Sequence, residues 1–205
     1  MNPIFFISKC ICWLGYKLFF RFTVKGTKNL PKKGGILILS NHVSMFDPPA
    51  VGSAAFKRPT WYMARDTLFK NPVFGAFLKS INAIPINRGT GFRGGYQKVK
   101  DRLAGGGAVI AFPEGTRSLD GNLQPGKAGV GMIIYETKAK VIPCYISGAD
   151  KALPKGRTFP VFFTRISVTF GPEVPLEDLL NLPEEKTTYQ QMIDRVMEHI
   201  GKLRD

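Results

Sequence analysis

Short apolar runs alternate along this chain with segments of helical spacing, and this alternation limits the fold more than any other feature. Buried-strand patterns cover residues 35–40, 60–64, 83–86, 108–112, 141–146 and 165–170. Helical patterns cover residues 47–56, 71–80, 96–104, 128–138 and 187–203. Strands that alternate with helices predict an α/β fold, with a mostly parallel or mixed sheet flanked by helices. Residues 150–163 match neither pattern, and we expect a loop or a β-excursion there.

The N-terminal segment is very apolar but is interrupted by two lysines. Residues 3–20 read PIFFISKCICWLGYKLFF. A lysine near the centre of a spanning helix costs about 2.5–3.5 kcal/mol, which disfavours a bilayer crossing. Lys9 and Lys17 would lie about 80° apart on a helix, so both could extend to water from one side. We therefore predict an interfacial, membrane-associating segment over residues 1–24 and a single domain over residues 25–205. A spanning helix and a helix packed on the domain core are the alternatives.

Positive charge is concentrated in the first half of the chain. The net charge is +14, and residues 1–100 hold 16 of the 29 Lys and Arg but only two acidic residues, Asp47 and Asp66. Such a face attracts nucleic acid, anionic lipid or an acidic substrate. No nucleic-acid recognition motif is present, so we expect a membrane surface and no nucleic acid as partner. The expected location is the cytoplasmic face of the cell membrane.

Three polar segments each follow a predicted strand. They are NHVSMFD at residues 41–47, IPINR at residues 84–88 and FPEGTRS at residues 112–118. In open α/β sheets, ligands bind beyond the carboxyl ends of the strands. We therefore expect the three segments to meet at one edge of the sheet and to form the functional site.

His42 and Asp47 are candidates for an acid–base pair. Five residues correspond to about 140° on a helix, so the two meet only if His42 lies in a loop and Asp47 begins the next helix. Asp47 would then accept a hydrogen bond from Nδ1 of His42 and leave Nε2 as a base. Purely structural roles are the alternative. Ser44 is more suited to bonding loop backbone, and Cys144 lies in an apolar strand, so the substrate itself would supply the nucleophile, for instance a hydroxyl.

The other two segments carry groups that suit a phosphate. Arg88 and Arg117 present planar guanidinium groups. Gly115 allows close approach of a backbone N–H, and Glu114 could pair with an arginine or bind a substrate hydroxyl. Surface ion pairs and a turn glycine are the alternative reading. With three cysteines that lack Cys-x-x-Cys spacing and only two histidines, no metal site is expected.

Taken together, these motifs resemble a known family. Asn41-His42-x-Ser44-x-x-Asp47, residues 84–88, residues 112–118 and Val141-Ile142-Pro143 resemble, in order and spacing, the four blocks of the glycerolipid acyltransferases. The resemblance covers about residues 25–175. The His-x-x-x-x-Asp pair alone is a weak signal, but together with FPEGTRS some 65 residues later it is a strong one.

The resemblance implies an activity and a set of roles. A fatty acyl group would move from acyl-CoA or acyl-acyl carrier protein to the sn-2 hydroxyl of 1-acyl-sn-glycerol-3-phosphate, giving phosphatidate for phospholipid biosynthesis without a metal or redox cofactor. His42 would be the general base and Asp47 would orient it. The residues expected to bind the acceptor are Arg88, Glu114, Gly115, Thr116 and Arg117. The alternatives are another lysolipid acceptor or a non-catalytic protein that binds anionic lipid.

Overall fold

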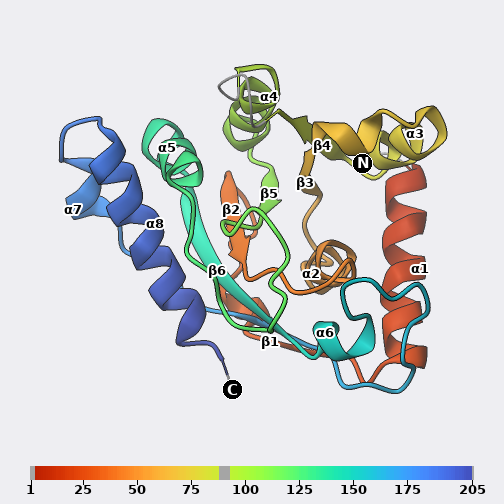
Figure 1. Ribbon diagram of the computed structural model, residues 1–205. Coiled ribbons are helices and arrows are strands. Elements are labelled where there is room, and N and C mark those ends of the chain that lie inside the picture. Colours follow the sequence, from red (N-terminus) through yellow and green to blue (C-terminus); the bar gives the residue numbers. More distant parts are fainter. Residues whose placement is uncertain (1–2, 88–92, 205) are drawn as a thin grey trace.

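The computed structural model describes residues 3–87 and 93–204 and contains a seven-stranded sheet with helices on both faces (Figure 1). The strands are β1 (Thr23–Lys25), β2 (Ile36–Ser40), β3 (Thr60–Arg65), β4 (Ala83–Ile86), β5 (Ala108–Ala111), β6 (Lys140–Ser147) and β7 (Ser167–Phe170). The α-helices are α1 (Pro3–Phe19), α2 (Asp47–Ala54), α3 (Pro72–Ser80), α4 (Arg93–Ala104), α5 (Ala128–Thr137), α6 (Ala149–Ala152), α7 (Glu177–Leu180) and α8 (Lys186–Gly201). Two 3₁₀ turns, η1 (Thr27–Asn29) and η2 (Asp66–Phe69), complete the set.

The sheet is mixed, as expected. Its strand order is β1-β7-β6-β2-β5-β3-β4, and every neighbouring pair is parallel except β6 and β7. Strands β2, β4 and β5 therefore point the same way, and their carboxyl ends share one edge. The predicted α/β fold is confirmed, and that edge is where the polar segments begin.

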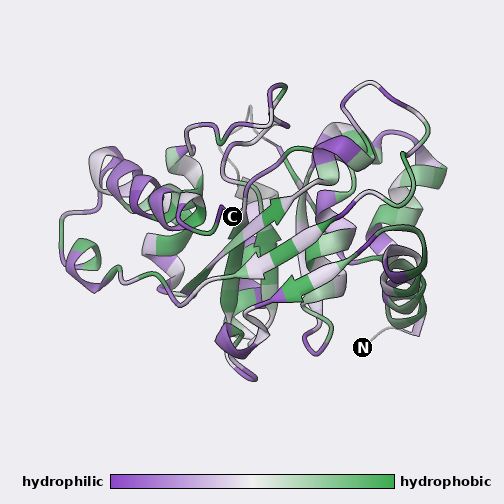
Figure 2. Cartoon of the chain, turned by 90° about the horizontal axis from the view of Figure 1, so that it is seen from below, coloured by the Kyte–Doolittle hydropathy of each residue, from purple (hydrophilic) through white to green (hydrophobic). Residues whose placement is uncertain are grey.

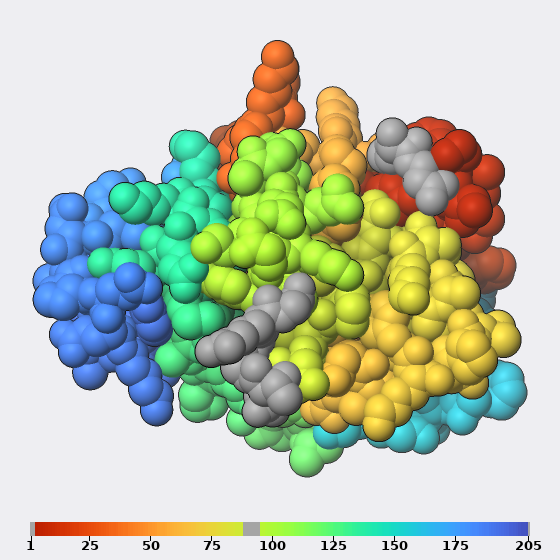
Figure 3. Space-filling model, turned by 90° about the horizontal axis from the view of Figure 1, so that it is seen from above, coloured from red at the N-terminus to blue at the C-terminus, as the bar shows by residue number. Residues whose placement is uncertain are grey.

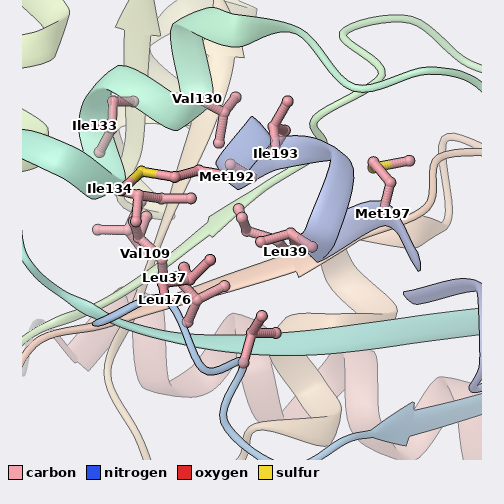
Figure 4. Close-up of a cluster of buried hydrophobic side chains, with 14 of the residues drawn as sticks. Leu37, Leu39, Val109, Val130, Ile133, Ile134, Leu176, Met192, Ile193 and Met197 are labelled. Carbon is pink, nitrogen blue, oxygen red and sulfur yellow. The ribbon is translucent and has the colours of Figure 1, made fainter. Parts of the chain in front are cut away.

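The central strand explains why its sequence is apolar throughout. Leu37 and Leu39 face the helices α4, α5 and α8, whereas Ile36 and Ile38 face α1 and α2, and all four are fully buried. A strand covered on both faces needs apolar side chains at every position. Figure 4 shows Leu37, Leu39 and Val109 beneath side chains from α5 and α8. Figure 2 shows hydrophobic segments on the strands and on the helices beside them.

The sequence analysis did not predict the shortest elements, among them both 3₁₀ turns. Strand β1, the turn of helix α6 and helix α7 are three or four residues long, too short for a periodic pattern to show. The expected loop or β-excursion at residues 150–163 therefore begins inside α6 and continues as a loop. After that loop the chain returns along β6 as strand β7, which is antiparallel to β6 and parallel to β1.

Helix α1 has one face on the core and one face exposed. Phe5, Lys9 and Tyr16 are buried against the domain. The opposite stripe is exposed and apolar, and its members recur at steps of three and four: Ile4 (58%), Ile7 (56%), Ile11 (65%), Leu14 (51%) and Leu18 (61%). One face of α1 thus packs on the domain core, and the interfacial role of the exposed face stays a prediction. None of the helices in the described part of the chain has the length and apolarity needed to cross a membrane. The division at residue 24 stays a prediction.

Lys9 does not extend to water, contrary to our expectation. Its Nζ donates to the carbonyl oxygens of Ala55 at 2.9 Å and Arg58 at 2.7 Å, just beyond the end of α2. The ammonium also lies over the rings of Phe5 and Phe56, at 5.6 and 5.9 Å. Burial lowers the pKa of Lys9 to about 8. Carbonyl oxygens at a helix end are good acceptors for a cation, and the sequence could not show that the residues after α2 would present them here.

Candidate active site

The loop after β2 is tied to the neighbouring strand before it reaches His42. Nδ2 of Asn41 donates to the carbonyl oxygen of Ile146 at 2.9 Å, and the amide of Ile146 donates to Oδ1 of Asn41 at 2.7 Å. A side-chain amide matches a peptide group in both directions, so this pair replaces a rung of the sheet where β2 ends. The position of the next residue, His42, is fixed from one side by this tether.

His42 and Asp47 meet in the geometry that their spacing predicts. Asp47 is the first residue of α2, and its Oδ2 lies 2.7 Å from Nδ1 of His42. The same oxygen accepts the backbone amides of Val43 at 2.6 Å and Ser44 at 2.7 Å. The Asp47 side chain is fully buried, while that of His42 is 19% exposed. Burial raises the pKa of Asp47, and the bonds from His42, Ser44 and Val43 oppose that shift.

These contacts orient the imidazole. A carboxylate beside Nδ1 favours the tautomer in which Nδ1 carries the proton, so Nε2 is the nitrogen with a free lone pair. The ring of Phe112 stacks on the imidazole with centroids 4.2 Å apart and planes 25° from parallel. The ring is thus held by a carboxylate at its edge and an aromatic face at its side.

The FPEGTRS segment holds the backbone of His42. The amide of His42 donates to Oε1 of Glu114 at 2.8 Å, and the amide of Ser118 donates to the carbonyl oxygen of His42 at 2.8 Å. The second oxygen of Glu114 accepts the amide of Gln124 at 3.3 Å. Glu114 is buried, with 2% of its surface exposed. Both of its hydrogen-bond donors are backbone amides. Its expected contact with the acceptor stays a prediction.

The buried Glu114 makes the stability of the fold depend on pH. Burial raises its pKa from 4.5 to about 7. The folded protein therefore holds this proton more tightly than the unfolded chain, and stability falls as pH rises from about 4.5 to about 7, by roughly 2–3 kcal/mol. In Glu114→Gln this contribution is absent. Urea unfolding at several pH values should show the difference in free energy between the two proteins shifting in favour of Glu114→Gln as pH rises. A difference that does not change with pH would contradict this account.

The remaining residues of the segment lie around a glycine turn. Gly115 has φ of +72°, a conformation that side chains disfavour. Thr116 is exposed and Arg117 is partly buried, next to the Ser118 amide that holds His42. The side chain of Lys127 lies against Gly115: a Cβ atom added to Gly115 would be 3.2 Å from Nζ of Lys127. A cation thus joins the turn from the start of α5, which the sequence analysis missed.

The second polar segment is farther along the same edge. Strand β4 ends at Ile86 and is separated from β5 by β3. Arg88 lies outside the described residues, so its expected position stays a prediction. The structure thus brings together the segments that contain His42, Asp47 and residues 114–117, and it places the end of β4 two strands from β5.

Helix α1 also supports the site, which no local pattern could reveal. Oη of Tyr16 donates to the carbonyl oxygen of Phe46 at 2.8 Å, one residue before Asp47. The ring of Tyr16 meets that of Phe46 edge-on, with centroids 5.9 Å apart. Thirty residues separate the two in sequence, and only the packing of α1 on α2 brings them together.

Comparison with known proteins places this site in a family. The family model described as Acyltransferase matches residues 21–147. The chain is 29% identical over 155 residues to the chloroplastic 1-acyl-sn-glycerol-3-phosphate acyltransferase BAT2 of Brassica napus, covering 74% of this chain and 44% of that protein. It is 26% identical over 188 residues to the 1-acyl-sn-glycerol-3-phosphate acyltransferase of Borreliella burgdorferi, covering 90% of this chain and 73% of that one.

The fold is also known. The crystal structure of the 1-acyl-sn-glycerophosphate acyltransferase PlsC from Thermotoga maritima matches with a TM-score of 0.71 at 23% identity, over 98% of this chain and 79% of that one. The chain belongs to the acyltransferase family, so the resemblance predicted from the four motifs is confirmed. It spans less than half the length of the plant and algal relatives that it matches.

Proposed function

We propose that this protein transfers a fatty acyl group from an acyl thioester, acyl-CoA or acyl-acyl carrier protein, to the sn-2 hydroxyl of 1-acyl-sn-glycerol-3-phosphate. The product is phosphatidate, a precursor of phospholipids. The observation that carries the proposal is the 2.7 Å contact between Nδ1 of His42 and Oδ2 of Asp47 at the edge where the FPEGTRS segment begins. The two relatives named above carry the name of this activity.

The reaction needs a base and no nucleophile from the chain. Nε2 of His42 takes the proton of the sn-2 hydroxyl, and the hydroxyl oxygen attacks the carbonyl carbon of the thioester. Asp47 stabilises the imidazolium that forms. The tetrahedral intermediate then collapses, the carbon–sulfur bond breaks, and the thiolate leaves with the proton from Nε2. The acceptor gains the acyl group, the donor leaves as a free thiol, and the step requires neither a metal nor a redox cofactor.

The contacts of the nearby nucleophilic side chains support this scheme. Oγ of Ser44 donates to the carbonyl oxygen of Leu153 at 2.8 Å and accepts the amide of Phe46 at 3.2 Å. Cys144 is fully buried, and burial raises the pKa of its thiol to about 12. A thiol that remains protonated is a poor nucleophile. An alcohol supplied by the substrate is therefore the better candidate.

The acceptor phosphate is assigned to the turn beside His42. Arg117 offers a guanidinium, and Lys127, whose side chain lies against Gly115, offers an ammonium. Gly115 and Thr116 belong to the same turn, and Arg88 completes the proposed set from the residues after β4. Glu114 joins this turn to the backbone of His42 and Gln124 through the amides that its carboxylate accepts.

Arg117 should affect the acceptor more than the donor. A hydrogen bond to a charged group contributes about 1.5–3 kcal/mol, so Arg117→Ala should raise the KM for lysophosphatidate by roughly 10- to 100-fold. The KM for the acyl thioester should change little. Steady-state kinetics with each substrate varied in turn measures both, and Lys98→Ala, an exposed cation on α4, is the matched control. Equal effects on the two constants would count against the phosphate role.

We also propose that the exposed stripe of α1 binds a membrane surface on the cytoplasmic side, where acyl thioesters are available. Burying a leucine or isoleucine side chain contributes about 1.5–3 kcal/mol, so Ile11→Ser with Leu14→Ser should lower vesicle binding by at least roughly 10-fold. Both side chains point away from the core, so the melting temperature should stay close to that of the wild type. Co-sedimentation with anionic vesicles measures the binding, and unchanged binding would remove the stripe from the proposal.

Acylation assays with the purified protein identify the acceptor and the donor. Lysophosphatidate should give phosphatidate with a CoA thioester, a carrier-protein thioester or both, compared at matched acyl chains. If lysophosphatidate gives no product while another lysolipid does, the acceptor is wrong although the family activity stands. If no lysolipid is acylated but anionic vesicles are bound, the protein is a binder and not an enzyme.

A further inference from the structure

The loop at residues 155–165 exposes aromatic and basic side chains together. Its sequence is KGRTFPVFFTR, and it connects α6 to β7. Four apolar side chains are exposed: Phe159 (82%), Val161 (41%), Phe162 (52%) and Phe163 (67%). Lys155, Arg157 and Arg165 are exposed among them, and no acidic residue occurs between residues 151 and 172. Exposed rings beside cations, with no anion near in sequence, are typical of a surface that meets anionic lipid.

The 155–165 loop is attached to the end of α1. The amide of Phe163 donates to the carbonyl oxygen of Phe19 at 2.7 Å, and the amide of Arg21 donates to that of Thr164 at 3.2 Å. The ring of Phe162 packs 5.7 Å from that of Phe19. Figure 1 shows the loop passing around the C-terminal end of α1. The C-terminal end of α1 and the 155–165 loop are therefore neighbours at the surface of the molecule.

Phe163 adopts a backbone conformation that a phenylalanine normally avoids. Its φ is +61°, in the left-handed region where glycine and asparagine are preferred. The cost of this conformation is not offset by burial, because Phe163 is 67% exposed. A strained residue with an exposed aromatic ring points to a role outside the folded chain itself.

We infer that the 155–165 loop is a second membrane contact, which docks with α1 on the surface of an anionic bilayer. The rings of Phe159 and Phe163 enter the boundary between headgroups and acyl chains, while Lys155 and Arg157 bind lipid phosphates. The inference rests on the proposed membrane association of α1 and extends it to a part of the chain more than 130 residues away.

A second contact has a consequence for the active site. A single interfacial helix leaves the molecule free to rotate about the helix axis, whereas two contacts fix its orientation. The loop is joined to the His42 segment by a short path: the amide of Val161 donates to the carbonyl oxygen of Ala152 at 2.7 Å, and Oγ of Ser44 donates to that of Leu153 at 2.8 Å. Docking of the loop thus sets how the site faces the lipid.

The test compares the binding of full-length variants to vesicles made of phosphatidylcholine and phosphatidylglycerol in equal parts. Phe159→Ser combined with Phe163→Asn should lower binding by at least roughly tenfold, because two exposed rings are removed. Asparagine tolerates the left-handed conformation, so the fold should be at least as stable, which thermal unfolding checks. Leu182→Ser is the control, since Leu182 lies between α7 and α8 on the side opposite α1 (Figure 3). It should bind like the wild type.

A charge variant tests the second half of the inference. Lys155→Gln with Arg157→Gln should weaken binding to the anionic vesicles and leave binding to pure phosphatidylcholine vesicles unchanged. If the two phenylalanine substitutions leave binding unchanged while Ile11→Ser with Leu14→Ser abolishes it, the loop is not a contact, although the proposed function stands. If the wild type does not bind vesicles at all, both proposals fail.

Discussion

His42→Ala should lower kcat for phosphatidate formation by about 10²–10⁴-fold or more, because a positioned general base contributes that much to the rate. The substitution should leave the fold intact. The ring is partly exposed, and Asp47 keeps the amides of Val43 and Ser44 as donors after the imidazole is gone. Thermal unfolding and vesicle binding should therefore stay close to the wild type while turnover is lost.

The chain contains its own matched control. His199, the other histidine, lies in the last turn of α8, on the side of the sheet away from α1. His199→Ala should keep wild-type kcat and KM. If His42→Ala retained wild-type turnover, the imidazole would not be the base.

Asp47→Asn should lower kcat by about 10²–10⁴-fold with little change in stability, in line with the loss of about 10⁴ that the equivalent change causes in a Ser-His-Asp triad. The geometry explains why the fold should tolerate it. Nδ1 of His42 and the amides of Val43 and Ser44 all donate to Oδ2, whereas Oδ1 has no hydrogen-bond partner among the described residues. An asparagine can place its oxygen at Oδ2 and its NH2 group at Oδ1, so the backbone bonds survive.

What asparagine cannot supply is the negative charge. Without it the imidazolium formed during proton transfer is no longer stabilised, and Nε2 becomes a weaker base. The measurement is kcat at saturating substrates, together with urea unfolding of both proteins. An unchanged kcat in a folded Asp47→Asn variant would show that Asp47 only shapes the loop.

The sequence was most informative where strands are buried on both faces. The run at residues 35–40 has no polar interruption before Ser40, and the chemistry-bearing loops start where such runs stop. Because β2 and β5 are parallel neighbours, the His42 segment and the FPEGTRS segment had to emerge side by side. That convergence follows from strand direction alone. The meeting of His42 with Asp47 is local and follows from the position of His42 in the loop and of Asp47 at the start of α2.

Contacts between distant segments were beyond the sequence. Lys9 looked like a lysine that extends to water, but the backbone carbonyls after α2 accept its ammonium. Glu114 is still expected to bind the substrate, but the sequence did not show that its two oxygens would also accept the amides of His42 and Gln124. Tyr16 gave no signal at all. In each case one of the partners is a backbone group. Every residue type except proline has the same backbone groups, so the sequence does not show which of them will be used.

The most direct test of the central claim is to mix the protein with a radiolabelled acyl thioester in the absence of an acceptor. If the lipid alcohol is the nucleophile and His42 only moves its proton, no acyl group should become attached to the chain and no burst of free thiol should appear. Adding lysophosphatidate should then release thiol and phosphatidate in equal amounts. A covalent acyl-enzyme formed before the acceptor is added would contradict the account, because a side chain of the protein would then be the nucleophile.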